Sequence, residues 1–335
     1  MGDSAFPLSE RRIILIRLPQ SRRPALDRPP AYDRAPSAVP SRPSAAPCMN
    51  LLETIELHLP RGYVIREQLG AGATSTVYLA ERADTGERLV VKVMKPGRLA
   101  QQMMDRFQTE MRILRKLEHP RIIPMLETGE AQGALFFTMP YVEGETLRTR
   151  LDREGPLAVR EALLVARDVT DALAHAHPRG VVHRDIKPAN ILLGADGAYL
   201  MDFGFARPPL AVASNGSVGE EGWIVGTPDY MSPEQVEAKR AADWRSDFFS
   251  LGCVLHEMLV GSPPFAGGSV RATMRRRLDT AAVDVRSLRP DVPADVAGII
   301  RCSLEVHPSA RFATAGFLRM AIDAALRGLE ETREP

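Results

Sequence analysis

The sequence predicts an α+β protein with two lobes. The chain has 335 residues and 44% of them are hydrophobic, which is enough for a sizeable core in two lobes rather than one compact unit. Apolar runs with β-branched and aromatic residues predict strands at 63–69 and 89–93, and at 135–144 a strand that ends in a connector between lobes. Apolar residues at helical spacing predict helices at 105–117, 161–176, 248–259 and 317–329.

Composition limits the classes of partner and the cellular compartment. The formal net charge is +1, so charge gives no reason to expect a nucleic-acid partner. The cysteines Cys48, Cys253 and Cys302 are odd in number, far apart and not in a C-x-x-C pattern, which argues against disulfides or a zinc site and for a reducing cytosol. No apolar run near the N-terminus approaches the ~20 residues of a membrane span, and 13–16 is too short for a signal-peptide core. We therefore expect a cytoplasmic protein without a membrane span.

Residues 1–59 form a separate segment in this interpretation. From 19 to 47 the composition is Pro, Arg, Ser and Ala without an apolar period, so the segment cannot bury enough surface to offset its ordering entropy. We expect a disordered tail, and Met49 raises the alternative that translation starts there.

A polar loop near the middle of the chain carries the chemistry. Asp185, Lys187 and Asn190 lie between the apolar runs 181–182 and 191–193, which can bury themselves and hold the loop still, and a second carboxylate, Asp202, follows. Two carboxylates and an amide are groups that gather around a metal-bound phosphate, because Mg²⁺ prefers such oxygens together with phosphate oxygens and water. The alternative is a polar turn between two strands of an unrelated α/β protein.

The run His183-Arg184-Asp185 with Asn190, followed by Asp202-Phe203-Gly204, resembles the catalytic motifs of the protein kinase family. Lys187, two residues after Asp185, is typical of its Ser/Thr branch, and the resemblance to bacterial-type Ser/Thr kinases covers about 63–328. It implies a kinase domain at 60–330, with a small, β-rich N-lobe at 60–139 that holds one main helix, a hinge at 140–144 and a larger, mostly helical C-lobe at 145–330. The implied activity is transfer of the γ-phosphoryl of ATP to protein Ser/Thr hydroxyls, including autophosphorylation.

The resemblance also implies catalytic roles. Asp185 would orient the substrate hydroxyl and accept its proton, and Lys187 would neutralise charge on the transferring phosphoryl. Asn190 and Asp202 would hold Mg²⁺, with Mn²⁺ as an alternative metal. Lys92 would position the ATP phosphates and pair with Glu110 on the following helix.

The nucleotide site follows from the same resemblance. The glycine-rich loop departs mildly from the family pattern, because Ser75 stands where the third glycine would be. Small residues there let backbone N–H groups approach phosphate oxygens. The expected nucleotide-contacting residues are Leu69, Gly70, Ala71, Gly72, Ala73, Thr74, Ser75, Thr76, Val77, Val90, Lys92, Met139, Pro140, Val142 and Leu192.

Other positions are implied to have structural or regulatory roles. Glu234 would pair with Arg311, and Asp247 would brace the catalytic loop. Arg184 implies a basic pocket for an anion from the activation loop. The candidate regulatory residues on that loop are Ser214, Ser217, Glu220, Glu221 and Thr227, the last more suited to substrate docking. One of the carboxylates of Glu220 and Glu221 would partly fill this pocket and leave basal activity without phosphorylation, and the alternative for both is a solvated acidic loop tip.

Two other functions stay open. A pseudokinase scaffold would usually lack one of Lys92, Asp185 or Asp202, and all three are present. A small-molecule phosphotransferase on the same fold would lack the peptide-docking segment 227–234. The expected partners are proteins with Ser/Thr hydroxyls and, for autophosphorylation, a transient second copy of the chain.

Overall fold

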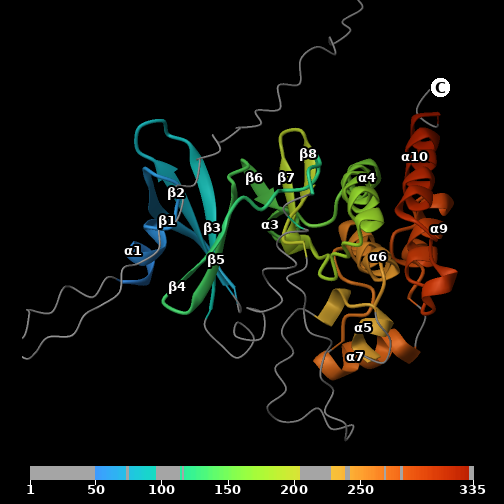
Figure 1. Cartoon of the computed structure of the whole chain (residues 1–335). Coiled ribbons are helices and arrows are strands. Elements are labelled where there is room, and N and C mark those ends of the chain that lie inside the picture. Colours follow the sequence, from blue (N-terminus) through green and yellow to red (C-terminus); the bar gives the residue numbers. More distant parts are fainter. Residues whose placement is uncertain are drawn as a thin grey trace, which may run out of the picture. The chain divides into compact units, whose positions relative to one another are not determined.

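The computed structural model describes residues 50–72, 75–95, 114, 117–203, 228–237, 242–267, 269–279 and 282–331. The first lobe is built on one antiparallel sheet with the strand order β1-β2-β3-β5-β4, and the second is mostly helical (Figure 1). The predicted fold class is therefore confirmed. The strands of the sheet are β1 (Tyr63–Ala71), β2 (Ser75–Arg82), β3 (Arg88–Met94), β4 (Thr128–Ala131) and β5 (Ala134–Pro140).

Strand β3 shows how the sheet presents its two faces. Leu89, Val91 and Val93 are buried, whereas Val90 and Lys92 between them are half-buried. Successive side chains of a strand point to opposite faces, so Val90 and Lys92 share the face that Leu89, Val91 and Val93 do not. In the β3–β5 register Val90 lies opposite Met139, and Lys92 lies opposite Phe137.

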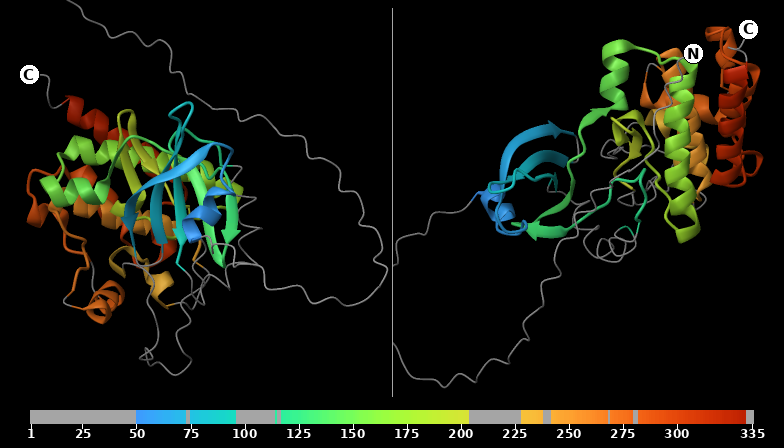
Figure 2. Two further views of the ribbon diagram at one scale, coloured as in Figure 1. Left: turned by 90° about the vertical axis from the view of Figure 1, so that its left-hand side faces the viewer. Right: turned by 90° about the horizontal axis from the view of Figure 1, so that it is seen from above.

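A short helix, α1 (Leu51–Glu56), packs on the sheet just before β1 (Figure 2). Its N-terminus has a capping box, in which Asn50 and Glu53 each accept the other's backbone N–H through a side-chain oxygen at 2.9 Å. Ile55 is fully buried with the sheet core, and the Glu56 carboxylate accepts the Ile65 N–H at 2.7 Å. The expected tail boundary at residue 59 is therefore wrong for 50–59. A six-residue helix is too short to show a helical period, and packing and its cap stabilise it.

A second, three-stranded sheet, in the order β6-β7-β8, begins the C-lobe after the connector 141–143. Its strands are β6 (Gly144–Thr146), β7 (Ile191–Gly194) and β8 (Gly197–Leu200). Because Ile191 pairs with Leu200, the residue before β7 meets the residue after β8, and the Met201 N–H donates to the Asn190 carbonyl at 3.1 Å. This hairpin brings Asn190 close to Asp202.

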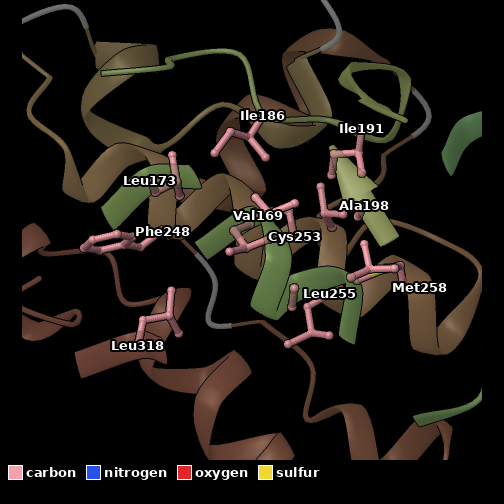
Figure 3. Close-up of a cluster of buried hydrophobic side chains, with 14 of the residues drawn as sticks. Val169, Leu173, Ile186, Ile191, Ala198, Phe248, Cys253, Leu255, Met258 and Leu318 are labelled. Atoms are coloured by element: carbon pink, nitrogen blue, oxygen red, sulfur yellow. The ribbon is translucent and has the colours of Figure 1, made fainter. Parts of the chain in front are cut away.

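Helices make up the rest of the C-lobe around one core (Figure 3). Helix α6 is buried from Ser246 to Leu259, as a central helix with apolar residues all round should be. Leu173 from α4 and Leu318 from α10 belong to the same core, and α4 lies alongside α10. The helices are α3 (Leu147–Glu154), α4 (Val159–Ala176), α5 (Pro233–Glu237), α6 (Arg245–Val260), α7 (Val270–Asp279), α8 (Val285–Leu288), α9 (Ala294–Ser303) and α10 (Ala315–Glu331).

The predicted elements agree with the observed ones within a few residues, with one exception that the structure does not cover. The strands expected at 63–69 and 89–93 are β1 and β3, and the last two expected helices are α6 and α10. Of the helix expected at 105–117, only Leu114 and Leu117 lie within the described residues, and both are buried. In the described part of the chain, no helix combines the length and the apolar composition needed to cross a membrane.

Candidate active site

The backbone of the polar loop is fixed by a carboxylate from α6. Asp247 is fully buried, and its two side-chain oxygens accept the N–H groups of His183 and Arg184, each at 2.8 Å. His177 Nε2 lies 2.9 Å from the same carboxylate. These contacts hold His183 and Arg184, the first two residues of the loop, against the first turn of α6.

His183 ties the loop to the segment after β8. Its ring is buried, its Nε2 is 3.0 Å from the Met201 carbonyl, and the Asp185 N–H donates to its Nδ1 at 3.2 Å. A backbone N–H can only donate and a carbonyl can only accept, so these contacts assign the donating nitrogen to Nε2 and the accepting nitrogen to Nδ1. The ring also packs on Phe203, with centroids 4.9 Å apart.

Three polar side chains of the loop converge, as the sequence predicted. Lys187 Nζ lies 2.9 Å from Asp185 Oδ2, and Asn190 Nδ2 donates to the same oxygen at 3.1 Å and to the Asp185 carbonyl at 2.8 Å. The Asp185 side chain is 24% exposed, so an incoming hydroxyl can reach it. Because Nδ2 of Asn190 faces Asp185, the side-chain amide oxygen of Asn190 is the atom that can coordinate a metal ion.

Asp202 lies beside this group in an uncommon backbone conformation. Its φ is 60°, in the left-handed region that residues other than glycine rarely adopt. One carboxylate oxygen pairs with Lys92, and the other, Oδ1, is buried without a hydrogen-bond partner within the described residues. A buried carboxylate oxygen is costly when nothing pairs with it, so this atom fits a cation ligand. Asn190 and Asp202 together fit a Mg²⁺ site, which needs only one or two protein carboxylates plus phosphate oxygens.

The partner of Lys92 in the structure is Asp202. Glu110, the partner expected from the sequence, lies outside the described residues. Lys92 is also 5.7 Å above the Phe137 ring on the neighbouring strand. Lys92 thus extends from the face of the sheet opposite α1, and its ammonium contacts the carboxylate of Asp202 just after β8.

Most of the expected nucleotide-contacting residues that the structure describes lie on β1–β3, the end of β5 and β7, and Gly72 and Val142 lie just outside these strands. The glycine-rich loop closes through the Gly72 N–H, which donates to the Ser75 carbonyl at 2.8 Å, and Lys95 Nζ donates to the Gly72 carbonyl at 2.7 Å. Met139 borders a small cavity that Phe137, Leu117 and Phe203 also line. Ala73 and Thr74 lie outside the described residues. The other expected contact residues lie on β1, β2, β3, β5 and β7 or in the connector 141–143. They are Leu69, Gly70, Ala71, Thr76, Val77, Val90, Pro140, Val142 and Leu192.

A buried ion pair anchors the segment after the active site. Arg311 donates to both oxygens of Glu234 at 2.8 Å, and Ser246 Oγ donates to one of them at 2.5 Å. Burial acts to raise the pKa of Glu234, but the Arg311 hydrogen bonds and charge outweigh burial, and the pKa lies below its usual value. The structure thus brings together the two residues that the sequence analysis paired.

The sequence did not predict two residues that contact the site, Glu257 and Gln235. Glu257 is 2% exposed, accepts the Tyr230 hydroxyl at 2.6 Å and pairs with Arg148 at 2.7 Å. Burial and the Glu257 charge raise the pKa of Tyr230. The available signal was an acidic residue within the otherwise apolar run of α6. Gln235 was also missed, although its side chain reaches the backbone of Arg184.

Of the expected regulatory residues, only Arg184 lies within the described part of the chain. Arg184 is exposed and has a φ of 63°. Ser214, Ser217, Glu220, Glu221 and Thr227 lie outside the described residues.

Comparison with known proteins identifies the family. The protein kinase domain family matches residues 63–321. The chain is 37% identical over 274 residues to the serine/threonine-protein kinase PknB of Mycobacterium tuberculosis, covering 79% of this chain and 43% of PknB. It is 34% identical over 273 residues to PknE of the same species, covering 81% of this chain and 47% of PknE. The chain thus spans less than half the length of these relatives.

A solved structure shows the same fold. A crystal structure of Rad53 1-466 in complex with AMP-PNP superposes with a TM-score of 0.64 at 25% identity, covering 77% of this chain and 64% of that one. The fold, the geometry around Asp185 and the sequence match agree, and the chain belongs to the protein kinase family, as a homologue of bacterial Ser/Thr kinases.

Proposed function

We propose that this chain is an ATP-dependent protein kinase that transfers the γ-phosphoryl group of ATP to Ser/Thr hydroxyls of proteins. The observation that carries the proposal is the convergence of Asp185, Lys187 and Asn190 next to Asp202, whose buried Oδ1 lacks a partner within the described residues. Family membership and the AMP-PNP bound to the Rad53 structure support ATP as the phosphoryl donor.

Each side chain has a separate task in this mechanism. Asp185 orients the substrate hydroxyl and accepts its proton as the hydroxyl oxygen bonds to the γ-phosphorus and the bond to ADP breaks. Lys187, held 2.9 Å from Asp185, places its positive charge where negative charge develops. Lys92 would contact the ATP phosphates, and Asn190 and Asp202 would hold Mg²⁺ or Mn²⁺. The metal neutralises charge on the phosphate oxygens when it is bound.

The domain limits and partners belong to the same proposal. The kinase domain begins at about residue 50 with α1 rather than at 60, has its hinge at 140–144 and continues to about residue 330. Its partners would be protein substrates and, during autophosphorylation, a transient second copy. The peptide-docking segment leads into α5, and the described part of it is held to α6 through Tyr230 and Glu257.

The decisive test uses Asp185→Asn in the full chain. With Mg-ATP and a general protein substrate, we expect the parent to form phosphoserine or phosphothreonine, and the variant to be slower by at least about a hundredfold, the usual contribution of a general base. Asp196→Asn makes the same chemical change in the exposed turn between β7 and β8, and we expect it to match the parent.

Other outcomes would point to other functions. ATP binding without transfer by the parent would favour a scaffold, and transfer only to small molecules would favour a small-molecule phosphotransferase. Phosphorylation of protein by Asp185→Asn at the parent rate would show that the mechanism is wrong.

A further inference from the structure

The side chain of Gln235, in helix α5, joins two segments that are far apart in the sequence. Its Nε2 donates to the carbonyl of Arg184 at 2.9 Å, across 51 positions, and its Oε1 accepts the N–H of Ser232 at 2.9 Å. The orientation of the amide is fixed, because the Ser232 N–H can only donate and the Arg184 carbonyl can only accept.

The bond to Arg184 acts on the peptide group directly before Asp185. That group consists of the Arg184 carbonyl and the Asp185 N–H, and its N–H donates to His183 Nδ1 at 3.2 Å. The peptide plane is therefore held at both ends, by Gln235 on one side and His183 on the other. A fixed peptide plane limits the directions in which the Asp185 side chain can leave the backbone.

The backbone at this point requires such support. Arg184 has a φ of 63°, and a residue other than glycine persists in the left-handed region only where its surroundings hold it there. Asp247 holds the Arg184 N–H at 2.8 Å, and Gln235 holds its carbonyl. The two contacts come from different elements, α6 and α5.

A simpler role for Gln235 explains only one of its two bonds. Ser232 and Gln235 form a capping box at the start of α5, since the Gln235 N–H also donates to Ser232 Oγ at 3.4 Å. The cap accounts for the contact between Oε1 and Ser232. It gives no reason for Nε2 to contact the catalytic loop.

We propose that Gln235 is a positioning residue for Asp185, which couples the end of the peptide-docking segment to the orientation of the catalytic carboxylate. The kinetic part of this inference rests on the proposed kinase function. Displacement of α5 would remove the contact to the Arg184 carbonyl and loosen the peptide before Asp185, so peptide docking and catalytic competence would be linked through one side chain.

The discriminating variant is Gln235→Glu in the full chain. A glutamate can keep the Ser232 contact and the helix cap, but its ionised carboxylate cannot donate to the Arg184 carbonyl. We expect kcat for protein phosphorylation to fall about tenfold, which corresponds to one lost hydrogen bond, with an unchanged KM for ATP and a melting temperature that falls less than in a variant that also loses the cap. Gln235→Met loses both contacts, and we expect the same fall in kcat together with a lower melting temperature.

A matched control makes the same chemical change elsewhere. Gln132 lies in the turn between β4 and β5, where its Nε2 donates to Thr54 Oγ1 at 2.7 Å. Gln132→Glu therefore also exchanges a donating amide for a carboxylate, and we expect its kcat to equal that of the parent.

Amide hydrogen exchange gives a readout that does not depend on activity. We expect the peptide that contains the Asp185 N–H to exchange several times faster in both Gln235 variants than in the parent or in Gln132→Glu. An inactive parent would overturn the proposed function, and the exchange data would still decide the role of Gln235. Gln235→Glu with parental kcat, whatever its exchange rate, would show that Gln235 serves only as a helix cap.

Discussion

At the level of single residues, Asp247 ties the backbone of the catalytic loop to α6. One buried carboxylate accepts two consecutive backbone N–H groups and lies 2.9 Å from His177. Backbone N–H groups that are buried without an acceptor are costly, so the loop depends on both oxygens of this side chain. The same carboxylate therefore contributes to the stability of the C-lobe and to the position of Asp185.

We expect Asp247→Asn to lower the free energy of unfolding by about 1–3 kcal/mol, because one oxygen is replaced by an NH₂ group that faces an N–H donor. Phosphoryl transfer should fall as well, since the Asp185 backbone loses its support. Urea denaturation measures the first effect and a protein phosphorylation assay the second.

The control for this substitution is Asp291→Asn, at a surface carboxylate that is 67% exposed and pairs with Arg289. Exposed pairs contribute little, so we expect a change of less than about 1 kcal/mol. Equal effects of the two substitutions would contradict the bracing role of Asp247.

Sequence motifs predicted the site residues that lie close together in the sequence. Asp185, Lys187 and Asn190 lie within one loop, so their spacing alone places them together. Gln235 could not be found in this way, because its contact with Arg184 spans 51 positions and exists only once α5 is docked. The pairing of Lys92 with Asp202 was missed for the same reason, since it depends on how β3 faces the end of β8.

Among the elements, α1 extends the N-lobe core beyond the region that matches the kinase family. The family match starts at residue 63, yet Ile55 is fully buried with Val91 and Phe136. We expect Ile55→Ala to cost about 2–4 kcal/mol of stability, as for other large-to-small core substitutions. Leu57→Ala removes a side chain that is 73% exposed, and we expect it to have almost no effect.

Two truncations test the same point and the domain limit. We expect removal of residues 1–48 to leave the melting temperature and the activity nearly unchanged, because the sequence of that segment has no apolar period. Removal of 1–59 should lower the melting temperature, because it also removes Ile55 and Leu59 from the core. Equal melting temperatures for the two truncations would show that α1 does not stabilise the N-lobe.

Periodicity predicted the longer elements well and the short ones poorly. Helices α4, α6 and α10 have enough turns for their apolar faces to show in the sequence. Helix α1 has only six residues, and its signal was the capping box of Asn50 and Glu53 rather than a period. Strand β1 extends to Ala71, past the expected end at residue 69, because its pairing with β2 continues through Gly70 and Ala71.

For the whole molecule, the sequence predicted two lobes but not how the strands pair. The order β1-β2-β3-β5-β4 requires β3 to pair with β5, across the intervening residues 95–133, and no local pattern encodes that choice. The family resemblance supplied the architecture instead.

The molecule as a whole should lose stability in mild acid. Burial lowers the pKa of His256, and burial together with neighbouring positive charge lowers the pKa of His119 and of His175, whose rings lie 5.0 Å apart. Since the unfolded chain protonates these groups near pH 6.5 and the folded chain does so only at lower pH, the unfolded state binds more protons in that window. Stability should therefore fall as the pH drops below about 6.5 and should not change through these groups above about 7.5.

Melting temperatures between pH 8 and pH 5.5 check this expectation. His256→Gln replaces a buried titrating ring with an amide that can still donate to the Ser262 carbonyl, which the His256 Nδ1 approaches to 2.9 Å. We expect the melting temperature of the variant to fall less between pH 8 and pH 5.5 than that of the parent. An identical fall would show that His256 does not contribute to the loss of stability in acid.

The burial of Cys253 in the middle of α6 also has a consequence for reactivity. Its side chain is fully buried in the C-lobe core, and burial raises the pKa of its thiol to about 12 (Figure 3). A thiol reagent attacks the thiolate, so in the closed core Cys253 is both inaccessible and uncharged. Alkylation of this one sulfur then proceeds only while α6 is transiently exposed, and its rate in native buffer measures how often the helix that carries Asp247 separates from its neighbours.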